Sequence, residues 1–86
     1  MVIALLFTRH DGLIHRMQTF SLEGHPFIAL NNLLKVEGLA ESGAAAKIAI
    51  GNGEVLVDGK TELRKRCKIL AGQVVSYREQ AIKVVE

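Results

Sequence analysis

A cluster of basic side chains between residues 60 and 68 is the part of this sequence best suited to binding a charged ligand. Its cations are Lys60, Arg64, Lys65, Arg66 and Lys68, and its only acid is Glu62. The whole chain of 86 residues carries a formal net charge of only +2. Such a local concentration of positive charge is typical of a site for an anionic partner, for example phosphate groups. A solvated run of charges without a partner is the alternative interpretation.

A second candidate is a strip of small residues around one cation. Gly43, Lys47 and Gly51 are four residues apart, so on a helix they would share one side. Ser42 is suited to cap that helix, and the free N–H groups at its start would point to the same side. A phosphate backbone could approach this strip closely. The alternative is that the small residues only allow two helices to pack tightly.

The remaining polar residues indicate no catalytic, metal or cofactor site. The histidines are His10, His15 and His25. None of them has a cysteine or carboxylate at the spacing of metal ligands, and no phosphate-binding glycine motif is present. Cys67 falls on the side of its segment predicted to face the core, where a cysteine acts as a small apolar residue rather than a nucleophile. We therefore expect a non-enzymatic protein without a cofactor.

The few aromatic residues favour recognition of backbone and shape. Phe20 and Phe27 are predicted to lie in the core, which leaves Tyr77 as the one stacking face. A protein that binds single-stranded nucleic acid through stacked bases needs more exposed aromatic rings. Contacts with phosphates and with the shape of a folded RNA need none.

Two predicted helices position the strip. The first follows Pro26, which is tolerated in a first helical turn, and ends at Gly38. Its predicted core face is Phe27, Leu30, Leu33 and Leu34, and its polar stripe is Asn31 and Lys35. The second spans residues 43 to 50, is capped by Ser42 and is stopped by the glycines that follow. Its predicted core face is Ala45, Ile48 and Ala49.

Short strands are predicted around the helix pair. Residues 19–22, 55–57, 74–78 and 82–85 have strand patterns, and Asp58-Gly59 is typical of a two-residue hairpin turn. Residues 60–69 alternate between charged and apolar side chains, with Leu63, Cys67 and Ile69 inward and a loop where Lys65 breaks the rule. The predicted fold is α+β, with an angular helix pair packed on a small, mostly antiparallel sheet.

We expect a single domain over residues 17–86, preceded by an N-terminal extension over 1–16. An additional hairpin at Asp11-Gly12 is the alternative for that segment. The apolar run at residues 2–7 is too short for a membrane span or a signal-peptide core. One cysteine suits a reducing compartment, so a cytoplasmic location is expected.

Residues 30–59 match the pattern L-x-x-L-L-K-x-x-G-L-A-x-S-G-x-A-A-K-x-x-I-x-x-G-x-V-x-V-D-G. This pattern resembles the RNA-binding domain named after the fourth protein of the small ribosomal subunit. The segments S-G-A-x-A-K-I-A-I and R-K-R-C-K-I are similar to the stand-alone YbcJ-type proteins of that superfamily. Many members carry an arginine after the capping serine and another at the start of the first helix, where this chain has Gly43 and Ile28.

The resemblance implies a surface that grips structured RNA. By position it implicates Lys35, Ser42, Gly43 and Lys47 and, more loosely, the basic residues from Lys60 to Lys68. We expect a monomeric RNA-binding module that contacts the phosphates of ribosomal or transfer RNA, within a ribosome or another ribonucleoprotein and away from membranes. The alternative is a module of the same fold whose basic patch binds an acidic protein.

Overall fold

The computed structural model describes residues 16–86 and contains two helices and seven strands within that range. The helices are α2 (Leu30–Val36) and α3 (Gly43–Gly51). The strands are β1 (Arg16–Ser21), β2 (Ile28–Ala29), β3 (Val55–Val57), β4 (Lys60–Thr61), β5 (Lys68–Ile69), β6 (Val74–Tyr77) and β7 (Gln80–Val85). One sheet has the order β1-β7-β6-β3-β4, and β2 pairs with β5 in a second sheet. Only the β1–β7 pair is parallel, so the predicted α+β fold with a mostly antiparallel sheet is confirmed.

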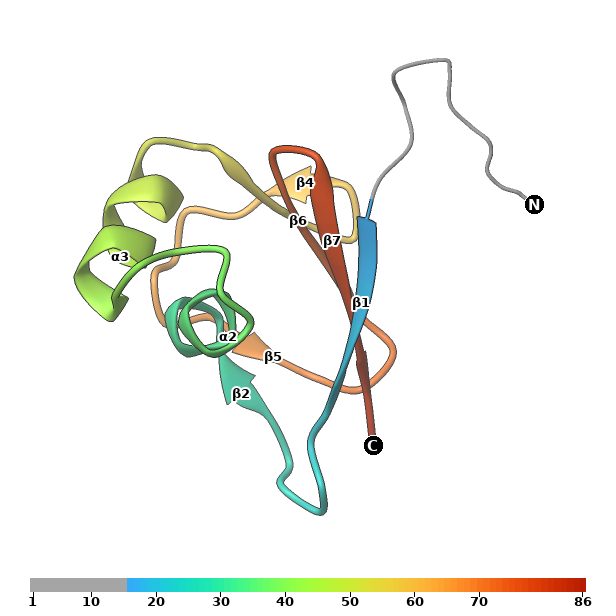
Figure 1. The fold of residues 1–86 in the computed structure, drawn as a ribbon. Coiled ribbons are helices and arrows are strands. Elements are labelled where there is room, and N and C mark those ends of the chain that lie inside the picture. The colour runs from blue at the N-terminus through green and yellow to red at the C-terminus, as the bar shows by residue number, and fades with distance from the viewer. Residues whose placement is uncertain (1–15) are drawn as a thin grey trace.

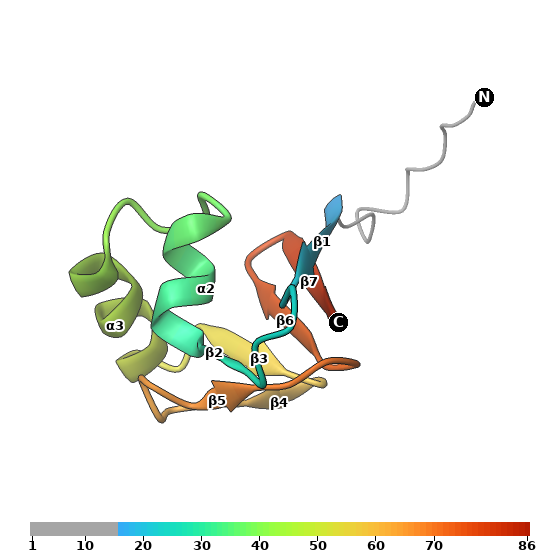
Figure 2. The same cartoon turned by 90° about the horizontal axis from the view of Figure 1, so that it is seen from below.

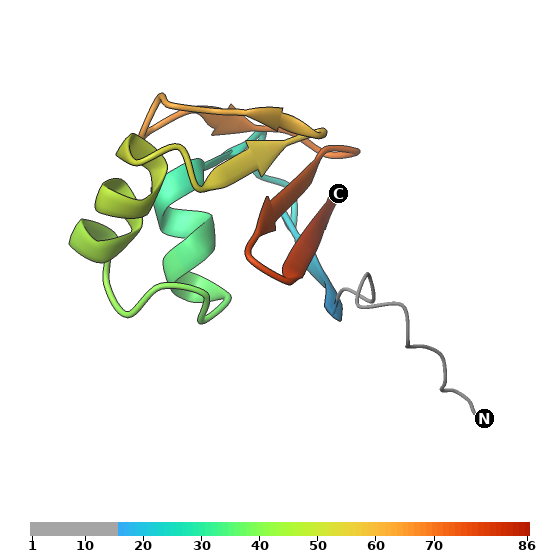
Figure 3. The same ribbon diagram turned by 90° about the horizontal axis from the view of Figure 1, so that it is seen from above.

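The helix α2 occupies the centre of the fold. Figure 1 shows it between α3 on one side and strands β7 and β1 on the other, and Figures 2 and 3 show the same order from below and above. Its Leu30, Leu33 and Leu34 are fully buried. Each such leucine stabilises the fold by about 1.5–3 kcal/mol relative to an exposed side chain. The core around them is formed by Ala46, Ala49, Ile50, Val55, Val57, Ile69, Val75, Ile82 and Val84.

The predicted unit of capped helix, stop, strand and turn is confirmed. The Ser42 hydroxyl accepts a hydrogen bond from the Ala45 N–H at 3.0 Å, which satisfies one of the free donors at the start of α3. The helix ends at Gly51, and Gly53 has a φ of 79°. Asp58 and Gly59 both have positive φ, at 51° and 83°, as a two-residue hairpin turn requires.

The predicted core face of α3 was partly wrong. Ile48 is 64% exposed, whereas Ala46 and Ile50 are fully buried together with Ala49. Both sets of residues have helical spacing, because most of the helix is apolar. The packing of α2 against α3 selects one of the two adjacent faces, and the sequence period does not.

The start of the first helix was also predicted too early. Residues 28 and 29 form β2 instead, because Ile28 and Ala29 pair with Ile69 and Lys68 of β5. Phe27 therefore lies outside the helix and is 39% exposed rather than in the core. Asn31, which was predicted to lie on an exposed polar stripe, is only 8% exposed.

The segment between β4 and β5 contains less strand than predicted. Lys65 and Arg66 form a turn, which confirms the loop expected there. Leu63 was predicted to point inward but is 58% exposed, because the chain leaves the sheet after Thr61. Cys67 packs against the core and is half-buried.

The predicted strand near residue 20 is confirmed as β1, and its parallel pairing with β7 links the two ends of the described chain. The alternatives for residues 1–16 concern a segment that, apart from Arg16 in β1, lies outside the described residues. The domain boundary at residue 17 stays a prediction.

Candidate nucleic-acid interface

The basic loop, defined here as residues 62–68, is attached by its backbone to the start of α2. The Leu30 N–H donates to the Cys67 carbonyl at 2.8 Å, and the Asn31 N–H donates to the Lys65 carbonyl at 3.2 Å. Ala29 occupies the N-cap position and offers no side-chain cap. Loop carbonyls therefore satisfy donors that the helix leaves free. This holds the basic loop against the helix pair.

Lys65 reaches from the basic loop to the end of α3. A Cβ atom placed on Gly51 would lie 3.3 Å from Lys65 Cε and 3.7 Å from its Nζ. The last turn of α3 contains no basic residue of its own. The Lys65 ammonium group thus lies beside the end of the helix where the partial charge of the backbone is negative.

Lys47 lies on the same side of α3 as Gly51. Residues four apart on a helix are neighbours, with Cβ atoms about 5–6 Å from one another. Lys47 is half-buried and Gly51 is exposed. The fold therefore gathers the cations Lys47 and Lys65, from distant parts of the chain, on one side of α3.

The start of α3 adds backbone donors to that side. Within residues 16–86, the N–H groups of Gly43 and Ala44 have no hydrogen-bond partner, because the Ser42 cap takes only Ala45. Two free N–H groups at a helix N-terminus favour an anion. Gly43 also lies beside Asn31, whose Nδ2 is 3.9 Å from the position a Cβ would occupy. The predicted strip is thus exposed at Gly51, where Lys65 lies against it, and in contact with α2 at Gly43. The contact of this strip with phosphate stays a prediction.

Arg64 differs from the other basic candidates because an acid pairs with it. Its Nε and Nη2 donate to the two carboxylate oxygens of Glu62 at 2.9 and 3.0 Å, and its backbone N–H donates to the same carboxylate at 2.9 Å. The side-chain hydrogen bonds from Arg64, followed by the backbone bond, lower the pKa of Glu62 from 4.5 to about 2. This ion pair stabilises the conformation of the basic loop and compensates the charge of Arg64.

The other basic residues predicted from the sequence lie around the side of α3 that carries Lys47 and Lys65, at different distances from it. Arg66 is exposed in the turn beside Lys65, and Lys35 is exposed in the last turn of α2. Lys68 holds its Nζ 4.8 Å from the centre of the Phe27 ring. Lys60 begins β4, which Figure 1 shows apart from α3. Within residues 16–86, Arg64–Glu62 is the one salt bridge, so none of the lysines of this surface is paired with a carboxylate.

Two residues near the site were missed by sequence reasoning. Asn31 is buried at the junction of α2, α3 and the basic loop, and its Oδ1 has no hydrogen-bond partner among the described residues. Phe27 stands exposed beside Lys68. The sequence offered one signal for each residue. Asn31 is a polar residue two positions before the Leu33-Leu34 pair, and Phe27 directly follows Pro26.

The described residues contain no group of three or more possible metal ligands. No helix among them is long and apolar enough to cross a membrane. Burial raises the pKa of the Cys67 thiol, an effect opposite to the activation of a nucleophile.

Comparison with known proteins gives consistent matches. The family model described as the S4 domain matches residues 20–85. The YbcJ proteins of Escherichia coli (strain K12) and Shigella flexneri are each 59% identical over 69 residues, which is 80% of this chain and 99% of theirs. A solution structure of E. coli YbcJ, described as revealing an αL motif involved in RNA binding, is 49% identical and has a TM-score of 0.65. That match covers 96% of this chain and 100% of the other. The chain is therefore similar to YbcJ in sequence and in structure, and it belongs to the S4 domain family.

Proposed function

We propose that this protein is a non-enzymatic module that binds structured RNA by contacting its backbone phosphates. The contact surface is centred on the side of α3 that carries Lys47 and Lys65, with the free N–H groups of Gly43 and Ala44 at its start. Arg66, Lys68 and Lys35 extend it along the basic loop and α2. The observation that carries the proposal is that the Lys65 side chain lies against Gly51, on the side of α3 that also carries Lys47, with no carboxylate paired to either lysine among residues 16–86.

Phosphates suit this surface better than base edges do. Its donors are ammonium groups and backbone N–H groups, which position a nucleic acid without reading its sequence. Gly43 has no side chain, so nothing on that residue obstructs the free N–H groups at the start of α3. The S4 family and the RNA-binding description of the YbcJ structure support the same ligand.

We further propose an oligomeric state, a class of RNA and a cellular location for the protein. A small, mildly basic domain with one cysteine fits a monomer that acts on ribosomal or transfer RNA in the cytoplasm. Arg64 and Lys60 have lesser roles in this scheme, because the first is paired with Glu62 and the second lies apart from α3.

A salt titration of binding tests the proposal. Each phosphate neutralised contributes roughly 0.7–0.9 to the slope of log affinity against log salt. A triple variant with Lys47, Lys65 and Arg66 replaced by alanine should flatten that slope by about 2, and by a similar amount for two unrelated folded RNAs.

Matched controls separate this site from general loss of charge. Lys83→Ala removes an exposed cation that alternates with the buried Ile82 and Val84 on β7, so it lies on the other face of the sheet. Arg64→Ala removes a cation already compensated by Glu62. Each of these two substitutions should change the salt slope by less than the roughly 0.7–0.9 that one phosphate contact contributes. Parallel slopes for wild type and triple variant would refute the phosphate surface and favour an acidic protein as the partner.

A further inference from the structure

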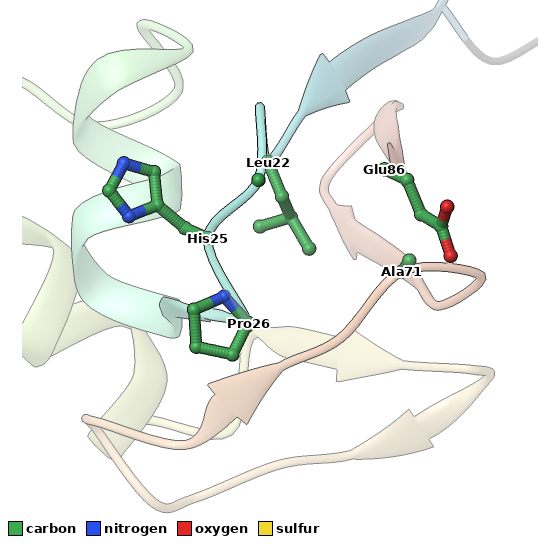
Figure 4. Close-up of a pocket in the computed structure, with 6 residues that line it drawn as sticks. Leu22, His25, Pro26, Ala71 and Glu86 are labelled. Atoms are coloured by element: carbon green, nitrogen blue, oxygen red, sulfur yellow. The ribbon is translucent and has the colours of Figure 1, made fainter.

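An apolar hollow lies beside the basic loop. It has a volume of about 180 Å³ and is lined by Phe20, Leu22, His25, Phe27 and Ile28. A second, more open hollow of about 330 Å³ shares Leu22 and His25 with it and continues to Ala71 and Glu86. Figure 4 shows Leu22 pointing into the second hollow, with Glu86 across from His25 and Pro26.

Phe27 is the exposed aromatic ring of the first hollow. The pairing of Ile28 with Ile69 fixes the backbone directly after it, so Phe27 is held at the surface rather than drawn into the core. The Nζ of Lys68 lies 4.8 Å from the centre of its ring. Lys68 belongs to the basic loop, so the hollow and the phosphate surface are continuous.

We propose that the first hollow receives an unpaired nucleobase of the RNA whose phosphates the basic loop contacts. This inference rests on the proposed function. Unstacked bases in RNA loops and bulges are commonly held on aromatic side chains. The apolar walls from Phe20 and Phe27 match the faces of a base, and the exposed imidazole of His25 is available to hydrogen-bond its polar edge.

The charges around the hollow define how the nucleotide lies. Lys68 offers a cation beside the Phe27 ring for a phosphate of the same nucleotide. The carboxylate of Glu86, at the far end of the second hollow, repels phosphate there. The sugar and phosphate therefore remain on the side of the basic loop, and only the base enters.

The test uses two RNA hairpins with the same stem, one fully paired and one carrying a single bulged 2-aminopurine. Wild-type protein should bind the bulged RNA roughly tenfold more tightly, as expected for one stacked base, and should quench the 2-aminopurine fluorescence. Phe27→Leu keeps an apolar side chain but removes the ring, so it should bind both RNAs equally and with an unchanged salt slope. Phe27→Tyr keeps the ring and should restore the preference.

Val36→Ala is the matched control, because Val36 is also exposed and apolar but lies outside the hollow. It should retain the preference for the bulged RNA. Two results would overturn the base site and leave the phosphate surface standing. One is equal, strongly salt-dependent binding of both RNAs by wild type, and the other is a preference for the bulged RNA that survives in Phe27→Leu. Failure of wild type to bind either RNA would overturn both.

Discussion

Replacement of Gly51 by alanine should move stability and RNA affinity in opposite directions. Gly51 is the last residue of α3 and does not need a positive φ, so alanine can adopt its conformation. Alanine is favoured over glycine by roughly 0.5–1 kcal/mol within a helix, and we expect the lower figure, about 0.5 kcal/mol, at this terminal position. For a domain of this size that gain raises Tm by about 2–4 °C.

The same methyl group meets Lys65. The new Cβ would lie 3.3 Å from Lys65 Cε, a contact tight enough to displace its neighbour by a few tenths of an ångström. Lys65 is exposed and its far end is flexible, so the side chain should move away at little cost in stability. Its ammonium group is then displaced from its position on the side of α3 that also carries Lys47, and the affinity for RNA should fall.

Thermal unfolding followed by circular dichroism measures the first effect, and fluorescence anisotropy with a folded RNA measures the second. The control is Gly51→Ala in a Lys65→Ala background, where the stability gain should remain and the affinity should no longer respond. Gly53→Ala, at a φ of 79°, should destabilise the protein instead. A lower Tm for Gly51→Ala would refute the argument that the Lys65 side chain moves away at little cost in stability. An affinity loss that persists in the Lys65→Ala background would refute the role of Lys65 in binding RNA.

Three further predictions follow from other contacts. Asp58→Ala should lower the unfolding free energy by about 2–3 kcal/mol, because it removes the carboxylate that accepts from the Val74 N–H at 3.0 Å and leaves alanine in a left-handed conformation. Asp58→Asn keeps an acceptor and tolerates that conformation, so an equal loss in urea unfolding would contradict the argument. The pKa of Glu62 is depressed from 4.5 to about 2, so its contribution to stability is present above pH 4.5 and is lost as the pH falls towards 2. Glu62→Gln should therefore be less stable than wild type at neutral pH and converge with it over that window in acid unfolding curves. Cys67 should react with a thiol reagent much more slowly in the native protein than in urea, because burial raises the pKa of its thiol; equal rates would show that the thiol is open to solvent.

Features encoded by a few neighbouring residues were predicted correctly. The Ser42 cap depends on a donor only three residues away, and the Asp58-Gly59 turn depends on two residues that accept positive φ. The leucines of α2 follow the helical period and are buried as expected. The family resemblance rests on the same local pattern, and it correctly indicated an S4 domain.

Features that depend on contacts between distant segments were not predictable. Both faces of α3 have helical spacing, so only packing against α2 could place Ile48 outside and Ile50 inside. Phe27 is exposed because the two residues after it form β2. That strand pairs with β5, which lies forty positions further along the chain. The pairing of Arg64 with Glu62 follows from their closeness in sequence, but its bidentate geometry is seen only in the structure.

The sequence by itself determined the two helices, the longer strands, the family and the presence of a basic cluster, because caps, turns and periodic apolar residues act over short distances. The tertiary structure decided which cations share a surface. The carbonyls of the basic loop hold it at the start of α2, and in this arrangement Lys65 lies against Gly51, from which the chain separates it by the β3–β4 hairpin.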